Sequence, residues 1–176
     1  VSGIDRDETY HHHSAVILMA ERAQNLAQLS QLLRLRDRVL PVGAGTKSAL
    51  VRETKDFDTV SLEGMDGILE YEPSEFTFTA LAGTPLKKIR DALTENGQYL
   101  PFDPPLVEAG ATLGGTVAAG LNGPGGFRFG TLRDFILGAQ YVDGNGEVLR
   151  SGGKVVKNAA GFDYHRFLVG SLGQFG

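Results

Sequence analysis

The chain has no cysteine, which excludes disulfide bonds, thiolate metal sites and a cysteine nucleophile. It has no excess of positive charge, because 17 lysines and arginines face 21 aspartates and glutamates, and it has no basic patch with interleaved aromatics. Nucleic acid is therefore not expected as a partner. No apolar run reaches the roughly 18 residues of a membrane span, and no secretory signal is recognisable. We expect no transmembrane segment and a cytoplasmic protein whose membrane association, if any, comes through a complex.

The length of 176 residues corresponds to about one domain, which can bury a core without covalent staples. The first 14 residues are polar and include three adjacent histidines, His11 to His13. Adjacent histidines on a chain end lack the preorganised spacing of a metal site. We therefore expect residues 1–14 to be a disordered or tag-like tail and assign no metal site, with a metal-binding tract at these histidines as the alternative.

What the chain has in abundance is glycine: 24 residues, eight of them among the 21 positions from 110 to 130. Their spacing has no collagen or linker period. Because glycine costs conformational entropy, such density is typical of backbone with positive φ or of backbone that a ligand approaches closely. Thr112 predicts the cap of a short helix over 112–119, whose free N–H groups attract phosphate or a carbonyl-rich ring. Close helix packing through small residues is the alternative.

A second glycine loop, at 43–48, follows an apolar run and fits neither common phosphate-binding motif. The dinucleotide fingerprint has a third glycine where Ser48 stands, and the other motif needs four residues between its first glycine and a Gly-Lys-Ser/Thr triplet. Consecutive N–H groups from Gly43 to Thr46 still form a concavity that can hold an anion. An ordinary turn is the alternative.

Hydrophobic spacing and turn residues predict the remaining elements. Helices are expected over 21–35 with one buried leucine stripe, from a Thr84-Pro85 cap and first turn to Asn96-Gly97, and over 163–168. Strands are expected over 15–19, 38–42, 59–62, 68–71 and 76–81, with extended chain over 50–54 and a hairpin formed by 135–142 and 147–150.

The first two expected strands are joined through a helix, whereas those after residue 67 read as antiparallel. The fold class is therefore α+β, with two small α/β lobes over 15–65 and 66–176. Three glycine-rich segments, 43–48, 110–130 and 152–176, lie far apart in the sequence. One extended cofactor between the lobes accounts for all three.

Five motifs in this order resemble a known family. They are Pro-Val-Gly-Ala-Gly-Thr-Lys at 41–47, Pro-Phe-Asp-Pro-Pro at 101–105, Ala-Thr-Leu-Gly-Gly at 111–115, the stretch 152–163 and Gly-Ser-Leu-Gly at 170–173. Together they resemble the FAD-binding domain of FAD-linked oxidases, of the vanillyl-alcohol oxidase and para-cresol methylhydroxylase (PCMH) type. The Lys-Asn-x-x-Gly-Phe-Asp element at 157–163 is most similar to the glycolate oxidase type of FAD-binding subunit. The resemblance implies a PCMH-type fold with FAD between its lobes.

The resemblance also implies which residues contact FAD. Those around the pyrophosphate are Val42, Gly43, Ala44, Gly45, Thr46 and Lys47. Those along the pyrophosphate and ribityl chain are Pro104, Ala111, Thr112, Leu113, Gly114 and Gly115. Those in the flavin region are Gly120, Gly126, Phe129 and Gly130, and those at the adenine side or flavin edge are Gly161, Gly170 and Gly173. Because the first loop contains no histidine, non-covalent FAD is expected.

The implied activity is an FAD-dependent oxidoreductase that oxidises a 2-hydroxy acid such as glycolate, with hydride passing to flavin N5. Family members continue beyond residue 173 into a further strand and a substrate domain. We therefore expect the substrate domain to be absent from this chain and the substrate to be reached through it or through partner subunits. A non-catalytic FAD-holding or electron-transfer module is the alternative, and a reductase acting on a nucleotide sugar is a third reading.

Catalytic residues are not assigned, but four side chains are candidates for roles near the flavin. Arg128 is a candidate cation for a substrate carboxylate, against the alternative of a surface salt bridge. His165 is a candidate base, against the alternative of a partly exposed structural residue. Lys154 and Lys157 are candidate cations for phosphate or reduced flavin, against the alternative of solvated lysines.

Overall fold

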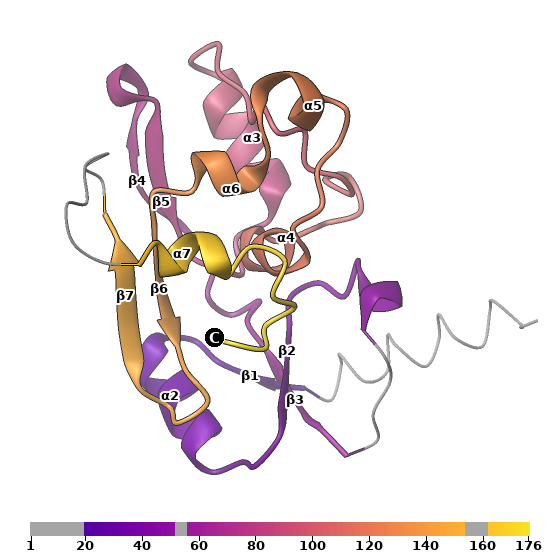
Figure 1. Ribbon diagram of the computed structural model, residues 1–176, viewed down its shortest axis with the longest axis vertical. Coiled ribbons are helices and arrows are strands. Elements are labelled where there is room, and N and C mark those ends of the chain that lie inside the picture. The colour runs from indigo at the N-terminus through magenta and orange to yellow at the C-terminus, as the bar shows by residue number, and fades with distance from the viewer. Residues whose placement is uncertain (1–19, 52–55, 154–161) are drawn as a thin grey trace, which may run out of the picture.

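Three parallel strands form one end of the molecule, in the order β1 (Glu21–Arg22), β3 (Asp58–Ser61) and β2 (Val39–Val42) across the sheet (Figure 1). The computed structural model describes residues 20–51, 56–153 and 162–176. Helix α2 (Leu26–Arg34) connects β1 to β2, as parallel strands require a crossover. β3 then pairs between them, with Val60 opposite both Glu21 and Pro41. The strands predicted over 38–42 and 59–62 are confirmed, and the one predicted over 15–19 lies outside the described residues.

The predicted helix over 21–35 begins too early. Its first two residues form β1, and Asn25 begins α2 because its side-chain oxygen accepts a hydrogen bond from the N–H of Gln28 at 3.0 Å. The leucine stripe of α2 is only half-buried. In the same region, Ser48–Leu50 forms the 3-10 turn η1, so the extended chain predicted from Leu50 is wrong at that residue.

Two antiparallel hairpins follow, β4 (Ile68–Glu72) with β5 (Thr77–Ala80) and β6 (Gly138–Val142) with β7 (Val148–Gly152). A 3-10 turn, η2 (Pro73–Glu75), joins the first pair. The second pair begins later than predicted, because Phe135 ends helix α6 (Leu132–Phe135), which a capping box of Thr131 and Asp134 starts.

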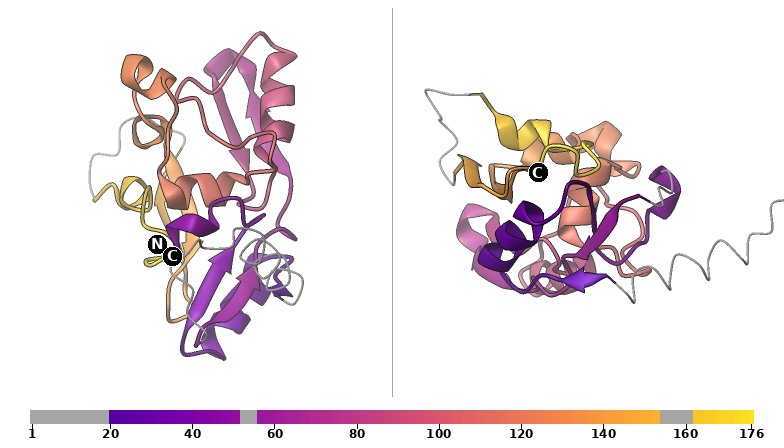
Figure 2. Two further views of the ribbon diagram at one scale, coloured as in Figure 1. Left: turned by 90° about the vertical axis from the view of Figure 1, so that its right-hand side faces the viewer. Right: turned by 90° about the horizontal axis from the view of Figure 1, so that it is seen from below.

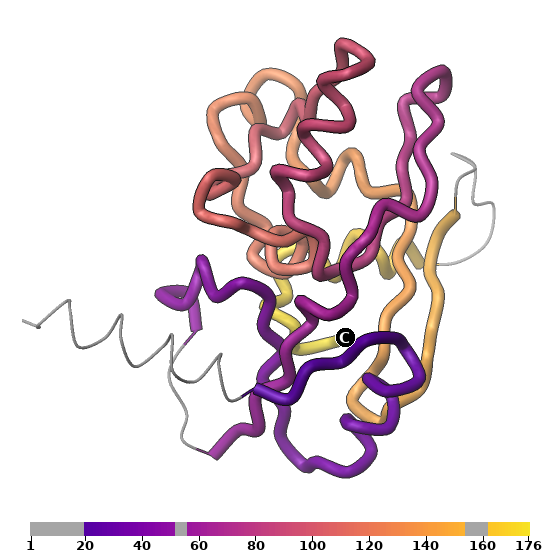
Figure 3. The backbone as a smooth tube through the Cα atoms, turned by 180° about the vertical axis from the view of Figure 1, so that it is seen from behind, coloured from indigo at the N-terminus to yellow at the C-terminus, as the bar shows by residue number. Residues whose placement is uncertain are grey.

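Hairpin β6–β7 runs along one side of the molecule, and its turn reaches α2 (Figure 3). The Ser30 hydroxyl and the Arg34 guanidinium both donate to the carbonyl oxygen of Gly146 in that turn. At the other end of the hairpin lies the short helix α7 (Tyr164–Phe167), as the sequence predicts. This hairpin therefore connects the parallel sheet to the C-terminal segment.

The chain from β4 to α6 lies beyond the parallel sheet along the long axis (Figure 2) and contributes most residues of two apolar clusters. In the first, helix α3 (Leu86–Thr94) packs its buried face, with Ala111, against β4 and β5. The second cluster contains Phe102, Leu132 and Val169. Helix α4 (Leu113–Ala119) contacts both clusters, because Leu113 packs on the first and Val117 on the second. The predicted helix over 112–119 is confirmed, with Thr112 as its cap.

Thr84 does not cap α3 as predicted. Pro85 occupies the cap position, and the Thr84 hydroxyl instead accepts from the N–H of Gly67 at 3.0 Å and donates to its carbonyl at 3.1 Å. Thr84 is fully buried. Its side chain thus fixes the chain between β3 and β4 to the start of α3. No helix in the described ranges is long and apolar enough to cross a membrane.

Candidate functional site

The loop after β2 offers a row of unused hydrogen-bond donors. None of the five backbone N–H groups from Gly43 to Lys47 donates to another described residue. The loop is nevertheless half-buried, and Gly45 has a positive φ of 65°. These N–H groups can therefore donate to acceptors from outside the chain, either water or a ligand.

The N-terminus of α4 is not the open donor site that the sequence suggests. The N–H groups of its first two residues donate to protein carbonyls, Leu113 to Thr84 at 2.9 Å and Gly114 to Ala82 at 2.7 Å. The N–H of Gly115 points to the Thr112 hydroxyl. The expectation that free donors of this helix attract phosphate is therefore wrong, and the donors of the loop remain.

Glycine at position 43 is required by the approach of this loop to α4. A Cβ added to Gly43 would lie 2.2 Å from the Thr112 hydroxyl oxygen. At the other end of the loop, the ammonium of Lys47 lies 3.4 Å from the hydroxyl of Thr116, one turn further along α4. The loop thus runs along the first turns of the helix.

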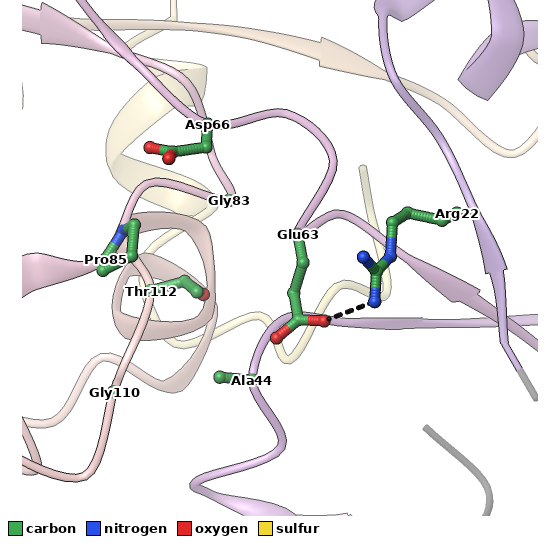
Figure 4. A pocket seen from close by; sticks show the side chains of 8 residues that line it. All are labelled: Arg22, Ala44, Glu63, Asp66, Gly83, Pro85, Gly110 and Thr112. Atoms are coloured by element: carbon green, nitrogen blue, oxygen red, sulfur yellow. Dashed lines mark hydrogen bonds and ion pairs between the residues drawn. The ribbon is translucent and has the colours of Figure 1, made fainter. Parts of the chain in front are cut away.

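A cavity of about 260 Å³ opens where the parallel strands end (Figure 4). Arg22 ends β1, Ala44 follows β2 and Glu63 follows β3, so one wall comes from the carboxyl ends of all three strands. In open α/β sheets ligands bind at this edge. The opposite wall consists of Asp66, Gly83, Pro85, Gly110 and Thr112.

The charged side chains of this cavity are paired. Arg22 and Glu63 form an ion pair at 3.3 Å, drawn as the dashed line in Figure 4, and Asp66 accepts from Lys88 at 3.1 Å. The sequence reasoning missed Arg22 and Glu63. The signal that identifies them is their place directly at or after a parallel strand.

The C-terminal glycine segment meets the other end of α4. The N–H groups of Gly170 and Leu172 donate to the carbonyls of Val117 and Ala118. Gly120 ends α4 with φ of 63°, and its Cβ would lie 2.9 Å from the Cα of Gly170. A Cβ on Gly173 would lie 2.5 Å from Pro41 of β2. Segments 43–47 and 170–173 therefore both pack around α4 and β2.

Comparison with protein families bears on what this glycine-lined region holds. The model of the FAD binding domain family matches residues 14–152, which is most of the chain. The chain belongs to the FAD-binding domain family. The resemblance seen in the sequence is thereby confirmed, and FAD is the cofactor of this domain.

Several curated relatives extend the comparison. Glycolate oxidase subunit GlcE of Escherichia coli K12 is 41% identical over 151 residues, covering 86% of this chain and 43% of that protein. Glycolate oxidase subunit GlcD of Bacillus subtilis is 30% identical, covering 87% of this chain and 33% of that protein. The D-lactate dehydrogenase of Archaeoglobus fulgidus is 30% identical, covering 86% and 35%. The chain thus spans less than half the length of these relatives.

A solved structure supports the fold. Alkyldihydroxyacetonephosphate synthase matches with a TM-score of 0.68 and 23% identity, covering 86% of this chain and 28% of that one. The α+β, PCMH-type fold of the FAD-binding domain is confirmed.

The other residues expected to contact FAD lie further along the molecule. Gly126 and Phe129 lie in helix α5 (Gly125–Phe129), which ends at Gly130 and is separated from the parallel sheet by α4 (Figure 1). A Cβ on Gly125 would meet the carbonyl of Pro101 at 2.5 Å, so this helix packs on the 101–105 segment that contains half-buried Pro104. Gly161, Lys154 and Lys157 lie outside the described residues, as do His11 to His13.

Arg128 remains available for a ligand in this part of the FAD-binding domain. Its guanidinium carbon lies 5.2 Å from the ring centre of Phe129. The side chain is exposed, and no carboxylate in the described portion forms an ion pair with it. Arg128 therefore forms no salt bridge with a described residue, contrary to the alternative interpretation.

His165 is a structural residue, and a buried one. It is 4% exposed, its Nδ1 lies 3.1 Å from the Ser151 hydroxyl oxygen, and its N–H donates to the same oxygen at 3.1 Å. Since that oxygen already accepts the backbone N–H, its hydrogen is free for Nδ1 of a neutral ring. The ring therefore joins α7 to β7, and the partial exposure expected for it is wrong.

Burial lowers the pKa of His165, with Asp163 raising it and Arg166 lowering it to smaller extents. The unfolded chain therefore binds a proton more readily than the folded one, and the free energy of unfolding falls as the pH drops below about 6.5. His165→Gln is expected to reduce this loss between pH 7 and pH 5. Denaturant titrations of both proteins at several pH values measure it, and an unchanged pH dependence in the variant would contradict it.

Proposed function

We propose that this FAD-binding domain serves an FAD-dependent oxidoreductase that oxidises a 2-hydroxy acid such as glycolate. The observation that carries the proposal is the row of five N–H groups at 43–47 that donate to no described residue, which suits the diphosphate of FAD. The substrate class is supported by the relatives, whose names refer to glycolate, D-lactate and D-2-hydroxyglutarate. All three are 2-hydroxy acids.

The proposed cofactor contacts divide into three groups along the chain. The loop and Val42 are proposed to hold the diphosphate through backbone N–H groups, and the residues from Ala111 to Gly115 to pass beside it as a close-packed wall. The remaining proposed contacts are Pro104, Gly120, Gly126, Phe129, Gly130, Gly161, Gly170 and Gly173. At Gly120, Gly126 and Gly173 an added Cβ would lie within 3.0 Å of neighbouring protein atoms, so the backbone there is closely packed, which supports the proposal.

The residues of this chain bind and orient, while bound FAD supplies the hydride-accepting ring. The first loop, fixed by the contact of Gly43 with Thr112, holds the diphosphate in one place. Arg128 is proposed to attract the substrate carboxylate, because its positive charge has only the Phe129 ring as a described partner. The base that takes the substrate hydroxyl proton is proposed to lie in the part of the protein that this chain does not span.

Two further features of the organisation are proposed. The chain divides near residue 65 into lobes of 15–65 and 66–176, a division supported by the cavity, whose walls come from both sides of that boundary. A partner subunit is proposed because two relatives are named as subunits of glycolate oxidase. The complete protein with its partner would then oxidise the substrate, and FAD would bind non-covalently.

Loading and reduction of the flavin test the proposed function. Purified protein mixed with FAD and desalted should retain flavin absorbance, and acid denaturation should release all of it. In the full-length protein, glycolate or D-lactate should bleach the flavin under anaerobic conditions, whereas a 3-hydroxy acid of equal charge should not. Protein that retains no FAD, or flavin bleached by NADPH and by no 2-hydroxy acid, would contradict the proposal.

A further inference from the structure

The ammonium of Lys47 has no negative partner in the described part of the chain. Its Nζ lies 3.4 Å from the hydroxyl oxygens of Thr46 and Thr116, and no described carboxylate lies within ion-pair distance. The two lysines of α3 differ, since Lys87 and Lys88 each have an aspartate partner. Among the described residues this half-buried cation contacts only hydroxyls, and such an environment is costly for a charge.

The loop around Lys47 presents only positive charge to a ligand. The five N–H groups of its loop present partial positive charge, and its ammonium adds a full one. Thr116 is fully buried on α4, so the lysine lies against a fixed wall. Burial lowers the pKa of Lys47, as expected for a cation with no described counter-ion. An anion with charged oxygens would suit both the donors and the ammonium.

We propose that the Lys47 ammonium is a specificity-determining contact, which makes this site select flavins that carry a diphosphate over flavins that carry no phosphate. The inference rests on the proposed function, because it takes the loop 43–47 as the diphosphate site. The backbone donors of the loop offer only partial positive charges to the diphosphate. The ammonium adds a full positive charge, and a charge-assisted contact of this kind is roughly twice as strong as a neutral hydrogen bond.

Ligands that differ in their phosphates test this proposal. Calorimetry or fluorescence would measure the affinity of the whole chain for FAD, for ADP, which has the diphosphate without flavin, and for riboflavin, which has flavin without phosphate. Lys47→Gln is expected to lower the affinity for FAD and for ADP about 10- to 100-fold and to leave the affinity for riboflavin unchanged. Lys47→Arg, which keeps the charge, should recover most of the loss. The matched control is Lys87→Gln, which removes the same charge from exposed α3 and should change nothing.

Each outcome bears on one of the two proposals. Wild type that binds neither FAD nor ADP contradicts the proposed function itself. If wild type binds both and Lys47→Gln binds them equally well, the role of Lys47 is wrong while the function stands. If Lys47→Gln loses affinity for FAD and for riboflavin by the same factor, Lys47 acts at the flavin or in folding. That result also overturns the inference.

A pH series gives a second test that needs no neutral variant. The described groups that face Lys47 are the hydroxyls of Thr46 and Thr116, and no described titratable group contributes to its pKa shift. A bound diphosphate raises the pKa of Lys47, so wild-type affinity for ADP should fall as alkaline pH deprotonates the free chain. Lys47→Arg, protonated at all these pH values, should keep its affinity to higher pH. Identical pH profiles would contradict the inference.

Discussion

Gly43→Ala is expected to reduce FAD affinity by at least about a hundredfold, as overpacking displaces the loop that carries the donors. The new Cβ would lie 2.2 Å from Oγ1 of Thr112 and 3.3 Å from its Cβ and Cγ2. Thr112 cannot turn away without loss, because it is 4% exposed and its hydroxyl caps α4. The loop must therefore lift from the helix, and the free energy of unfolding is expected to fall by about 1 to 3 kcal/mol.

Calorimetric titration with FAD and denaturant unfolding measure the two effects of Gly43→Ala. The control is Gly144→Ala in the β6–β7 turn, where a Cβ meets no atom within 4 Å. Adding Thr112→Ala to Gly43→Ala removes the clashing oxygen and methyl group, so it should restore part of the affinity despite a cap loss of about 1 kcal/mol. Wild-type affinity in the single variant would show that the loop does not depend on its approach to α4.

The sequence predicts the glycine loop, the cap of α4 and a helix over 112–119, because these features depend on local chemistry. A threonine before a run of small residues specifies a helix start wherever the chain folds. Gly120 likewise permits the left-handed end of that helix. The approach of 43–47 to α4 was expected only in general form, as convergence on one cofactor.

What the sequence could not give depends on contacts between distant segments. A strand of two residues, β1, has too little pattern to detect, so the leucine spacing of α2 extended the predicted helix over it and hid Arg22. The donors of α4 are used by Ala82 and Thr84, which are about 30 positions away. The local motif shows where the N–H donors of α4 lie. It does not show that carbonyl oxygens from a distant segment already accept their hydrogen bonds.

Gly120→Ala is expected to lower the free energy of unfolding by about 2 to 5 kcal/mol, the sum of two separable costs. One is the left-handed conformation, φ 63°, which costs an alanine roughly 1 to 2 kcal/mol. The other is packing, because the Cβ would lie 2.9 Å from Cα and 3.0 Å from N of Gly170, both backbone atoms that cannot rotate away. The C-terminal glycine segment must then move off α4.

Gly97→Ala separates these two costs. Gly97 follows the end of α3 with φ 66°, nearly that of Gly120, but its Cβ would meet no atom within 4 Å. This variant should therefore lose only the conformational part, about 1 to 2 kcal/mol, and keep wild-type FAD affinity. Since Gly120 and Gly170 are proposed cofactor contacts, Gly120→Ala should also weaken FAD binding. Equal losses of stability in the two variants, with equal FAD affinity, would mean that the packing of 170–173 on α4 contributes neither to the fold nor to the site.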